Sequence, residues 1–424
     1  MGEIDILLGL QWGDEGKGKI VDALTPEYDI IARFQGGPNA GHTLLFENKK
    51  YILHTIPSGI FRKEKLNIIG NGLVIDPSIF LKEVRSLEIP VDELVDKLII
   101  SSRAHLILPT HRLLDEAYED AKGVMKIGST LKGIGPAYTD KTSRSGLRTG
   151  ELLKDNFHEI YTIHRERHLK ILQNYEINTK IEEYEKEWFE GIELLKKFRI
   201  INTEYYINKS LNEEKRILAE GAQGTMLDID FGSYPYVTSS NTISAGACSG
   251  MGVSPRKTGR IYGIFKAYCT RVGSGPFPTE LHNKTGQKLR DNGYEYGSTT
   301  GRPRRCGWLD MPALKYSCMI NGVTSLFMTK ADVLTGFEKI KVCTAYKTGN
   351  SFVEELPFDV NADIEPVYIE MKGWSEDITG IREYDMLPAA LKEYVSFIEK
   401  ETGIPVNIVS VGPDRSETIM KGKF

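Results

Sequence analysis

Short apolar runs alternate with glycine-containing turns over residues 1–100. The runs cover residues 4–8, 29–34, 50–54, 66–76 and 97–101. Runs of this length between turn residues are typical of buried strands, and the more polar stretches that separate them favour helices. The pattern predicts an α/β fold in which strands and helices alternate.

The pattern changes after residue 104, where the chain becomes charged and helical. Ile181, Tyr184, Trp188, Ile192 and Leu195 recur at the spacing of one helix face, which predicts a helix over residues 180–198. Beyond residue 200 strands return, and one further helix is indicated near residues 388–400. The later strands are predicted at residues 216–219, 260–268, 323–329, 340–346 and 406–411.

Composition and charge narrow the class of protein. With 424 residues the chain exceeds what one core usually fills, so about two to three domains are expected. The net charge is −4, which argues against a nucleic-acid partner recognised by bulk charge. The five cysteines include no C-x-x-C pair, which fits reduced thiols better than a disulfide framework or a zinc site. No basic and apolar leader opens the chain, and no apolar run reaches about 18 residues, so we expect a cytoplasmic protein.

A glycine-rich segment follows the first apolar run. Residues 9–20 read Gly-Leu-Gln-Trp-Gly-Asp-Glu-Gly-Lys-Gly-Lys-Ile, and Gly13 to Lys19 has the spacing of a phosphate-binding loop. In such a loop, backbone N–H groups and a lysine surround phosphate oxygens at the start of a helix. Ile20 stands where that motif has its Mg²⁺-binding hydroxyl, so a metal ligand must come from elsewhere. Asp14 is the nearest carboxylate, and an acid inside a phosphate loop points to chemistry.

A second glycine cluster, residues 33–43, also follows a predicted strand and should lie at the same edge of the sheet. A histidine inside a glycine loop favours a functional role over a structural one. His42 and Asp14 then form an acid/base pair on neighbouring loops. The alternative is that each side chain only caps local backbone.

Two later clusters suit the recognition of anions and of guanine. Arg302, Arg304 and Arg305 fall within four residues, and forked guanidinium groups bind carboxylate and phosphate oxygens; a solvated basic loop is the alternative. Residues 329–332 read Thr-Lys-Ala-Asp after an apolar strand. Asp332 there can accept from guanine N1–H and the 2-amino group, which adenine cannot offer. This pattern is short enough to occur by chance, and it gains weight from the phosphate loop.

One histidine pair is predicted to be unrelated to the chemistry. His164 and His168 are four residues apart on a predicted helix, as in some metal sites. The residues between them read Arg-Glu-Arg, which is not the order of a zinc-protease motif. We expect a solvated helix face there.

These motifs together resemble the adenylosuccinate synthetase family, a group of GTP-dependent ligases of purine synthesis. The likeness runs in order through residues 11–19, 34–43, 133–138, 220–224, 237–241, 300–305 and 410–415. It implies a central, mostly parallel sheet of the phosphate-loop NTPase type, with a helical subdomain and a smaller α/β part. The corresponding division is a nucleotide-binding α/β core (1–104 and 201–270), a helical subdomain (105–200), and a C-terminal part with the aspartate loop and guanine motif (271–424).

The resemblance also implies a reaction. The family joins IMP and L-aspartate to give adenylosuccinate, while GTP becomes GDP and phosphate. Asp14 would take the N1 proton of IMP, so that O6 attacks the γ-phosphorus and forms 6-phosphoryl-IMP. His42 would donate a hydrogen bond or proton to the developing charge. One Mg²⁺ ion per subunit would be held by Asp14 and the carbonyl of Gly41, and the aspartate amine would then displace phosphate.

Family correspondence implies three binding sets and a homodimer, in which Arg144 reaches the IMP of the partner subunit. The GTP set is Gly13, Asp14, Glu15, Gly16, Lys17, Gly18, Lys19, Gly41, His42, Thr43, Arg304, Lys330, Ala331, Asp332, Ser410, Val411 and Gly412. The IMP set is Asp14, Glu15, Gly16, Lys17, Asn39, Ala40, Gly41, His42, Thr130, Arg144, Gln223, Thr238 and Arg302. The aspartate set is Ser298, Thr299, Thr300, Gly301, Arg302, Pro303 and Arg304.

Two other classes of protein share part of this pattern. A GTP-binding switch would use the same phosphate loop together with Lys330 and Asp332, but it needs neither His42 nor a three-arginine loop. A nucleotide kinase would not need Asp14 as a base. Phosphate release that requires both IMP and aspartate distinguishes the ligase from both.

Overall fold

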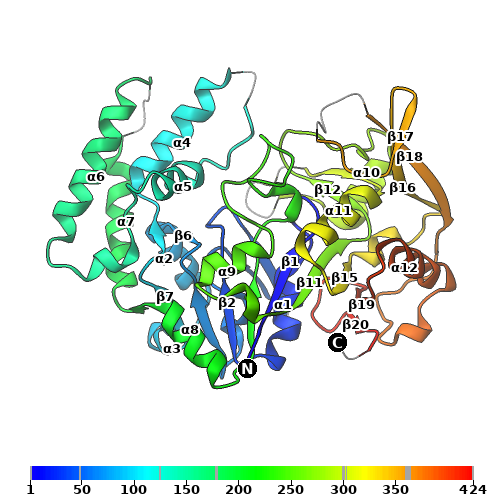
Figure 1. Cartoon of the computed structure of the whole chain (residues 1–424), viewed down its shortest axis with the longest axis horizontal. Coiled ribbons are helices and arrows are strands. Elements are labelled where there is room, and N and C mark those ends of the chain that lie inside the picture. Colours follow the sequence, from blue (N-terminus) through cyan, green and yellow to red (C-terminus); the bar gives the residue numbers. More distant parts are fainter. Residues whose placement is uncertain are drawn as a thin grey trace.

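One large sheet runs through the centre of the molecule (Figure 1). The computed structural model describes residues 2–46, 49–123, 126–176, 180–297, 301, 303–358 and 364–422. Within these residues the sheet has ten strands. From one edge to the other they are β20 (Thr418–Met420), β19 (Val406–Ser410), β15 (Ser325–Thr329), β11 (Thr258–Lys266), β1 (Ile4–Gly9), β10 (Ile217–Glu220), β2 (Ile30–Arg33), β5 (Leu66–Ile69), β7 (Leu98–Ser101) and β9 (Arg199–Ile201).

Neighbouring strands of this sheet are parallel, except that β19 and β20 are antiparallel. The strands are apolar on both faces because helices cover both faces. In β1, Ile6 and Leu8 pack into the core beneath the later helices, whereas Leu7 packs on the opposite face with Ile20 and Val21 of the first helix. Parallel pairing brings the carboxyl ends of the strands to one edge, where the loops after them meet.

The helices gather in groups around this sheet. The helices that the described residues form between positions 109 and 195 lie at one end of the molecule, at the left of Figure 1, and the last helix lies at the opposite end. Their bounds are α1 (Lys17–Leu24), α2 (Pro77–Ser86), α3 (Val91–Lys97), α4 (Pro109–Ala121), α5 (Ile134–Thr142), α6 (Phe157–Leu172), α7 (Glu182–Leu195), α8 (Thr203–Asn212), α9 (Ala245–Met251), α10 (Lys284–Gly293), α11 (Met311–Asn321) and α12 (Ala389–Thr402).

Local sequence sets where several helices start. Asp76 caps α2 by accepting from the N–H groups of Ser78 and Ile79, and Pro77 occupies the first helical position, where no N–H is needed. Gly16 precedes α1 in a left-handed conformation, φ 88°, which only glycine adopts without strain. The phosphate-loop sequence therefore turns directly into a helix, as its spacing predicts.

Smaller sheets complete the fold. β12 (Cys269–Arg271) pairs with β13 (Arg305–Gly307), β3 (His42–Phe46) with β4 (Lys49–Leu53), and β6 (Val74–Ile75) with β8 (His105–Leu106). A four-stranded sheet contains β14 (Leu309–Asp310), β16 (Lys339–Thr348), β17 (Ser351–Val353) and β18 (Ile364–Lys372).

The predicted fold class is confirmed: this is an α/β protein with a central, mostly parallel sheet. The helices predicted at 180–198 and 388–400 are present as α7 and α12. The run 66–76 is divided into β5 and β6. The prediction of a buried strand at 50–54 is wrong, because β4 belongs to a hairpin with β3 outside the central sheet and is exposed at its start.

The division into three parts remains a prediction. Strands β15, β19 and β20, which come from residues 271–424, extend the same sheet as β1, β2, β5 and β7. None of the helices in the described part of the chain combines the length and the apolar character needed to cross a membrane.

Candidate functional site

A cavity of about 930 Å³ opens at the carboxyl edge of the central sheet. The loops that follow β1, β2, β10, β15 and β19 all reach it. Sequence-predicted site residues that line it are Gly13, Asp14, Glu15, Gly16, Lys17, Gly18, Lys19, Asn39, Ala40, Gly41, His42, Thr43, Thr130, Gln223, Thr238, Arg304, Lys330, Asp332, Ser410 and Gly412. Residues from both ends of the chain therefore meet in one cavity.

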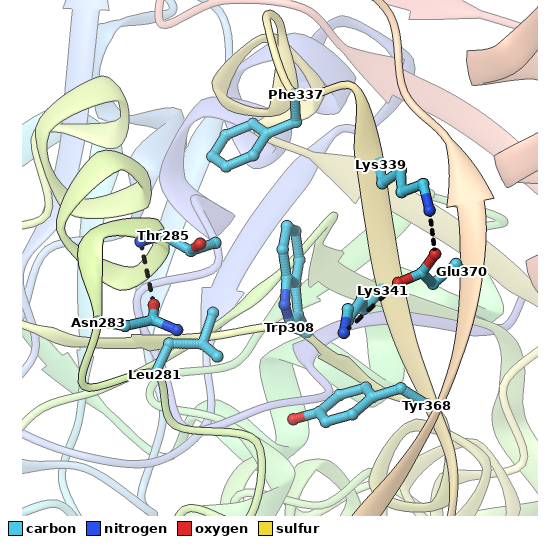
Figure 2. A pocket seen from close by; sticks show the side chains of 9 residues that line it. All are labelled: Leu281, Asn283, Thr285, Trp308, Phe337, Lys339, Lys341, Tyr368 and Glu370. Carbon is cyan, nitrogen blue, oxygen red and sulfur yellow. Dashed lines mark hydrogen bonds and ion pairs between the residues drawn. The ribbon is translucent and has the colours of Figure 1, made fainter.

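A second, smaller cavity of about 300 Å³ lies beside β16 and β18 (Figure 2). Trp308 and Phe337 provide aromatic walls, with ring centroids 5.6 Å apart. Lys339 and Lys341 both form ion pairs with Glu370, with Nζ to carboxylate oxygen distances of 2.7 and 3.5 Å. Of the predicted site residues that the structure describes, none lines this second cavity.

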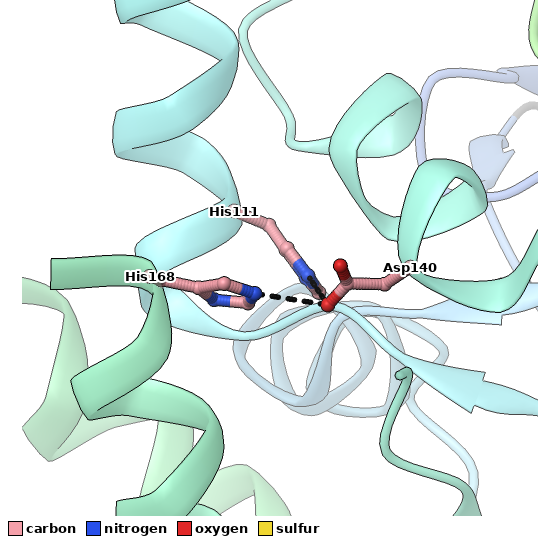
Figure 3. A group of neighbouring side chains, drawn as sticks. All are labelled: His111, Asp140 and His168. Carbon is pink, nitrogen blue, oxygen red and sulfur yellow. Dashed lines mark hydrogen bonds and ion pairs between the residues drawn. The ribbon is translucent and has the colours of Figure 1, made fainter. Parts of the chain in front are cut away.

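A cluster of two histidines and one aspartate connects helices α4, α5 and α6 (Figure 3). Asp140 of α5 lies 3.1 Å from Nε2 of His111 on α4 and 2.9 Å from Nε2 of His168 on α6, and it also pairs with Arg167. Burial alone would raise the pKa of Asp140, but hydrogen bonds from the two rings hold it below its ordinary value. The expectation of a solvated face at residue 168 is wrong, because His168 is buried.

The same cluster is poorly suited to a metal ion, although its three ligand atoms lie within 4.8 Å of one another. His111 Nδ1 accepts from the N–H of Leu108, so in the neutral ring Nε2 carries the hydrogen and offers no lone pair. The Arg167 guanidinium already neutralises Asp140 at 2.5 Å. The cluster fixes the position of α5 by hydrogen bonds.

The phosphate loop is held by Glu15, which is completely buried. Its carboxylate accepts from the N–H groups of Gln11 and Gly13 and from Lys17 at 2.5 Å. The hydroxyl of Thr329, at the end of β15, donates to the Glu15 carbonyl at 2.7 Å. These contacts give the loop its shape and join it to the strand that precedes the predicted guanine motif.

Lys19, the lysine of the loop motif, is directed at protein acceptors. Its Nζ donates to Ser410 Oγ at 2.8 Å, to the Gly412 carbonyl at 2.6 Å and to the Glu417 carbonyl at 3.1 Å. Burial lowers the pKa of Lys19 to about 8, opposed by the nearby Glu417, Asp332 and Asp414. Lys19 therefore ties the loop to the segment after β19, and Lys17 is the second loop lysine that lines the cavity.

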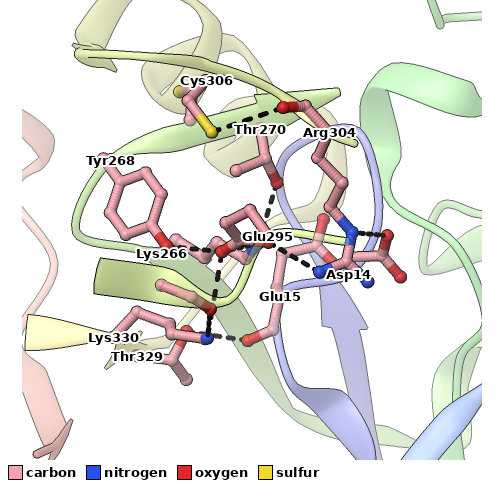
Figure 4. Close-up of polar contacts among 12 residues, drawn as sticks. Asp14, Glu15, Lys266, Tyr268, Thr270, Glu295, Arg304, Cys306, Thr329 and Lys330 are labelled. Carbon is pink, nitrogen blue, oxygen red and sulfur yellow. Dashed lines mark hydrogen bonds and ion pairs between the residues drawn. The ribbon is translucent and has the colours of Figure 1, made fainter. Parts of the chain in front are cut away.

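Asp14 stands at the mouth of the loop in a left-handed conformation, φ 59°. Its Oδ2 forms an ion pair with Arg304 Nε at 2.7 Å (Figure 4). Arg304 also pairs with the buried Glu295 at 2.6 Å, and Glu295 in turn pairs with Lys266 at 2.8 Å. A network of buried charges thus holds the arginine against the acid that the sequence marks as a base.

His42, the first residue of β3, is buried next to the loop. Its Nδ1 lies 2.5 Å from Glu220 Oε1. Nε2 has no hydrogen-bond partner among the described residues. Burial lowers the pKa of His42 to about 4, and the charge of Arg33 acts in the same direction, while Glu220 opposes it.

Two further polar atoms in the cavity wall are buried and unpartnered in the same way as His42 Nε2. Gln223 Oε1 and Asp332 Oδ1 find no hydrogen-bond partner in the part of the chain that the structure describes. Burial raises the pKa of Asp332, and Lys330 opposes this rise. Because buried polar atoms are nearly always bonded, several such unpartnered atoms at one cavity indicate a site that binds a polar ligand.

Two oxygen donors suit a magnesium ion. Asp14 offers a carboxylate and Gly41 a backbone carbonyl, and both residues line the cavity. Hard oxygen donors of this kind are those that Mg²⁺ prefers. Ile20 points into the core with no exposure, so it contributes no ligand.

Some predicted residues lie away from this cavity. Ala331 and Val411 are fully buried behind it, and Gly301 and Pro303 are exposed. Arg144 is exposed, with φ 64°, and does not line the cavity. The other residues predicted to bind the substrate aspartate lie outside the described residues, namely Ser298, Thr299, Thr300 and Arg302.

Several residues of the site were not predicted from the sequence, and three of them make contacts that bear on the chemistry. Glu220 contacts His42, Glu295 holds Arg304, and the buried Arg271 lines the cavity beside Trp12. Only Glu220 carried a local signal, since it is an acid at the carboxyl end of an apolar strand. The other two owe their position to long-range packing.

The fold and this site define a nucleotide-dependent α/β enzyme with a phosphate loop. Comparison with known proteins narrows the class. The family model for adenylosuccinate synthetase matches residues 6–419. The chain is similar to the adenylosuccinate synthetase of Bacteroides fragilis, with 58% identity over 99% of both chains, and to that of Phocaeicola vulgatus, with 58% identity over 98% of both. The solved structure of the fully ligated adenylosuccinate synthetase from Plasmodium falciparum has a TM-score of 0.94, with 41% identity over 99% of this chain and 100% of that one.

The chain belongs to the adenylosuccinate synthetase family. Members are ligases that form a carbon–nitrogen bond between IMP and L-aspartate while GTP becomes GDP and phosphate, and this is the reaction of the present chain. The family uses a metal ion. The sequence-based prediction of family and reaction is confirmed.

Proposed function

We propose that Asp14 and His42 carry the chemistry of this ligase in the cavity at the carboxyl edge of the sheet. The observation that supports this most is a set of buried atoms in its wall that have no hydrogen-bond partner among the described residues; the set includes His42 Nε2, Gln223 Oε1 and Asp332 Oδ1. Buried polar atoms without partners cost free energy, about 1–3 kcal/mol each. A purine nucleotide and a second nucleotide with exposed donors would satisfy them.

Asp14 is proposed as the general base. O6 of IMP is a poor leaving group, and removal of the N1 proton puts negative charge on that oxygen. The oxygen then attacks the γ-phosphorus of GTP, and the aspartate amine displaces the phosphate from C6. His42 would act through Nε2 on the oxygen where charge develops, since Nδ1 is already taken by Glu220.

The metal is proposed to be one Mg²⁺ ion per subunit, held by the Asp14 carboxylate and the Gly41 carbonyl. When bound, it supplies positive charge against the phosphates of GTP. This arrangement requires no hydroxyl ligand at position 20, where the chain has Ile20. The chain's own contribution is the loop geometry that Glu15 fixes and the orientation of the carboxylate by Arg304.

The binding sets are proposed as the family likeness implies them. GTP would lie on the phosphate loop, with its guanine against Asp332, whose bare oxygen can accept from two guanine donors. IMP would lie between the two glycine loops and Gln223, and aspartate at the loop 298–304. Arg304, which contacts Asp14, joins these subsites.

A homodimer is proposed, with Arg144 reaching the IMP of the partner subunit. Arg144 is exposed and lies two residues beyond the end of α5 at Thr142. The hydrogen-bonded cluster around Asp140 fixes that helix against α4 and α6. A long cation on a rigid base suits contact with a phosphate in a neighbouring subunit.

Two further predictions are kept as proposals. A cytoplasmic location is supported by five free thiols, four of them buried, which suit a reducing compartment. The division into a nucleotide-binding core, a helical subdomain and a C-terminal part is supported by the hydrophobic cluster of Leu113, Leu114, Ala117, Leu172 and Ile181, which lies wholly within residues 105–200.

An omission assay tests the proposed chemistry. The purified chain receives GTP and Mg²⁺ with IMP and aspartate, and with each left out in turn, while phosphate and adenylosuccinate are measured. We expect phosphate release only in the complete mixture, with one adenylosuccinate for each phosphate. GTP hydrolysis without aspartate would favour a switch, and phosphate transfer to a nucleotide without aspartate would favour a kinase.

A further inference from the structure

Glu220 contacts the ring of His42 at the centre of the fold. Glu220 is the last residue of β10, between β1 and β2, and it is fully buried. Its Oε1 lies 2.5 Å from His42 Nδ1. The two residues are 178 positions apart in the chain. A buried carboxylate against one ring nitrogen fixes the tautomer of the histidine, that is, which of the two nitrogens carries the hydrogen.

The hydrogen bonds from Ser58 indicate that the Glu220 carboxylate is an acceptor towards the His42 ring. Ser58, at the start of a short helix (Ser58–Phe61), donates its N–H to Glu220 Oε2 at 2.8 Å and its hydroxyl to Oε1 at 2.6 Å. An ionised carboxylate that receives two donors accepts a third from the ring. Nδ1 of His42 therefore carries a hydrogen, and Nε2 is the nitrogen that faces the cavity.

The ring is also closed in from the side of the phosphate loop. A Cβ atom added at Gly18 would lie 3.0 Å from the Cβ of His42, so α1 packs directly against this residue. Backbone pairing fixes Glu220 itself, because it stands in register with Leu7 of β1 and Arg33 of β2. Both partners of the contact are therefore held by rigid elements.

We propose that Glu220 is a positioning residue for His42: its carboxylate accepts a hydrogen bond from Nδ1–H and thereby directs Nε2 at the reacting centre. This inference rests on the proposed role of His42. With its Nδ1–H held by this carboxylate, the ring keeps one orientation, and Nε2 stays directed into the cavity.

A charge-balancing role is the competing explanation for Glu220. The Arg33 guanidinium is completely buried, and its three nitrogens find no hydrogen-bond partner among the residues described. Glu220 and Glu83 are the acids whose charges act on it. Glu83 accepts hydrogen bonds from the N–H groups of residues 54–56, whereas the carboxylate bonded to His42 is that of Glu220, so Glu83 serves as a matched control.

Glu220→Gln separates the two explanations. The amide oxygen would stay with the Ser58 N–H at the Oε2 position, so the NH₂ group would take the Oε1 position, face Nδ1 and move the ring hydrogen to Nε2. We expect kcat to fall by roughly 10- to 100-fold, as for other residues that orient a functional histidine, with KM for GTP and IMP changed less than about threefold. Glu83→Gln should keep kcat per folded enzyme. Equal losses of kcat in both variants would assign Glu220 to charge balance.

A spectroscopic measurement makes the test independent of turnover. Nitrogen NMR of ¹⁵N-histidine enzyme reports which ring nitrogen of His42 carries hydrogen, with His42→Asn to assign the signal. We expect Nδ1–H in the wild type and Nε2–H in Glu220→Gln, with Glu220→Asp restoring part of the Nδ1–H form and of kcat. Should Glu220→Gln fail to fold, the wild-type signal alone decides, because a neutral ring with its hydrogen on Nε2 overturns the inference.

Failure of this inference differs from failure of the proposed function. If His42→Asn turns over normally, the proposed role of His42 is wrong, whatever Glu220 does. If His42→Asn is inactive while Glu220→Gln keeps wild-type kcat and the Nδ1–H signal, Glu220 does not position the ring.

Discussion

Replacing Asp332 by asparagine tests how the nucleotide base is chosen. Asp332 stands just after β15, in a short helix (Ala331–Leu334), and its Oδ1 is buried without a partner among the described residues. The proposed role is to accept from N1–H and the 2-amino group of guanine. In Asp332→Asn one oxygen becomes NH₂, so a donor faces a donor, and the size and shape of the side chain stay the same.

The magnitude follows from the burial of that oxygen. A hydrogen bond to a charged group contributes about 1.5–3 kcal/mol, and a buried donor left mispaired costs about 1–3 kcal/mol. These effects overlap, so the net loss should be about 2–4 kcal/mol, which is roughly 30- to 1,000-fold in kcat/KM for GTP. XTP presents an acceptor in place of the 2-amino group, so the variant should use XTP better than the wild type does.

The assay is adenylosuccinate formation at fixed IMP and aspartate, with GTP, ITP and XTP varied in turn. Asp414→Asn is the matched control, because Asp414 also acts by charge on Lys19 but does not line the cavity. We expect the control to keep its preference for GTP. If Asp332→Asn retains the wild-type order of GTP, ITP and XTP, then Asp332 is structural and the guanine site lies elsewhere.

Three other predictions test the base, the dimer and the buried charges. Asp14→Asn should lower kcat by roughly 10²–10⁴-fold, because the base is lost together with a proposed metal ligand, and near-normal turnover would remove Asp14 from the chemistry. Arg144→Leu should raise the KM for IMP with little change for GTP; mixed with Asp14→Asn under free subunit exchange it should recover roughly a quarter of wild-type activity, and no recovery would place Arg144 outside a shared site. Burial alone would raise the pKa of Glu295, but the charge of Lys266 and two further cations lowers it to about 2 from 4.5. This depressed pKa gives stability that is present above pH 4.5 and lost as the pH falls towards 2. Glu295→Gln should therefore reduce the free energy of unfolding at pH 7 by about 3 kcal/mol and weaken the fall of that free energy between pH 4.5 and 2, measured by denaturant titrations. An unchanged fall in this pH range would contradict the prediction.

Local spacing was enough to predict the phosphate loop and the α/β class. Glycines at fixed intervals after an apolar run define a strand, a turn and a helix start, because each step depends only on neighbouring residues. The structure bears this out, with β1, a left-handed Gly16 and α1 in that order. The helix over 180–198 was predictable for the same reason, since one apolar face repeats along it.

Local patterns failed where burial depends on a distant partner. Residues 50–54 contain the apolar run Tyr51-Ile52-Leu53, yet among the described residues β4 pairs with β3 outside the central sheet. His168 looks solvated by its neighbours in sequence, but α4 and α5 cover it and supply Thr110 and Asp140 as partners. Neither packing arrangement follows from the periodicity of the segment itself.

The sequence by itself determined which residues can carry the chemistry: a carboxylate in a phosphate loop, a histidine in a glycine loop and an acid after a strand. Only the tertiary structure decided how they act together. The order of strands in the sheet places Glu220 between β1 and β2, against a histidine 178 positions away, and leaves Asp332 Oδ1 bare in the same cavity wall when all described residues are considered. Strand order depends on the burial of whole strands, summed over the fold, and no single motif encodes that sum.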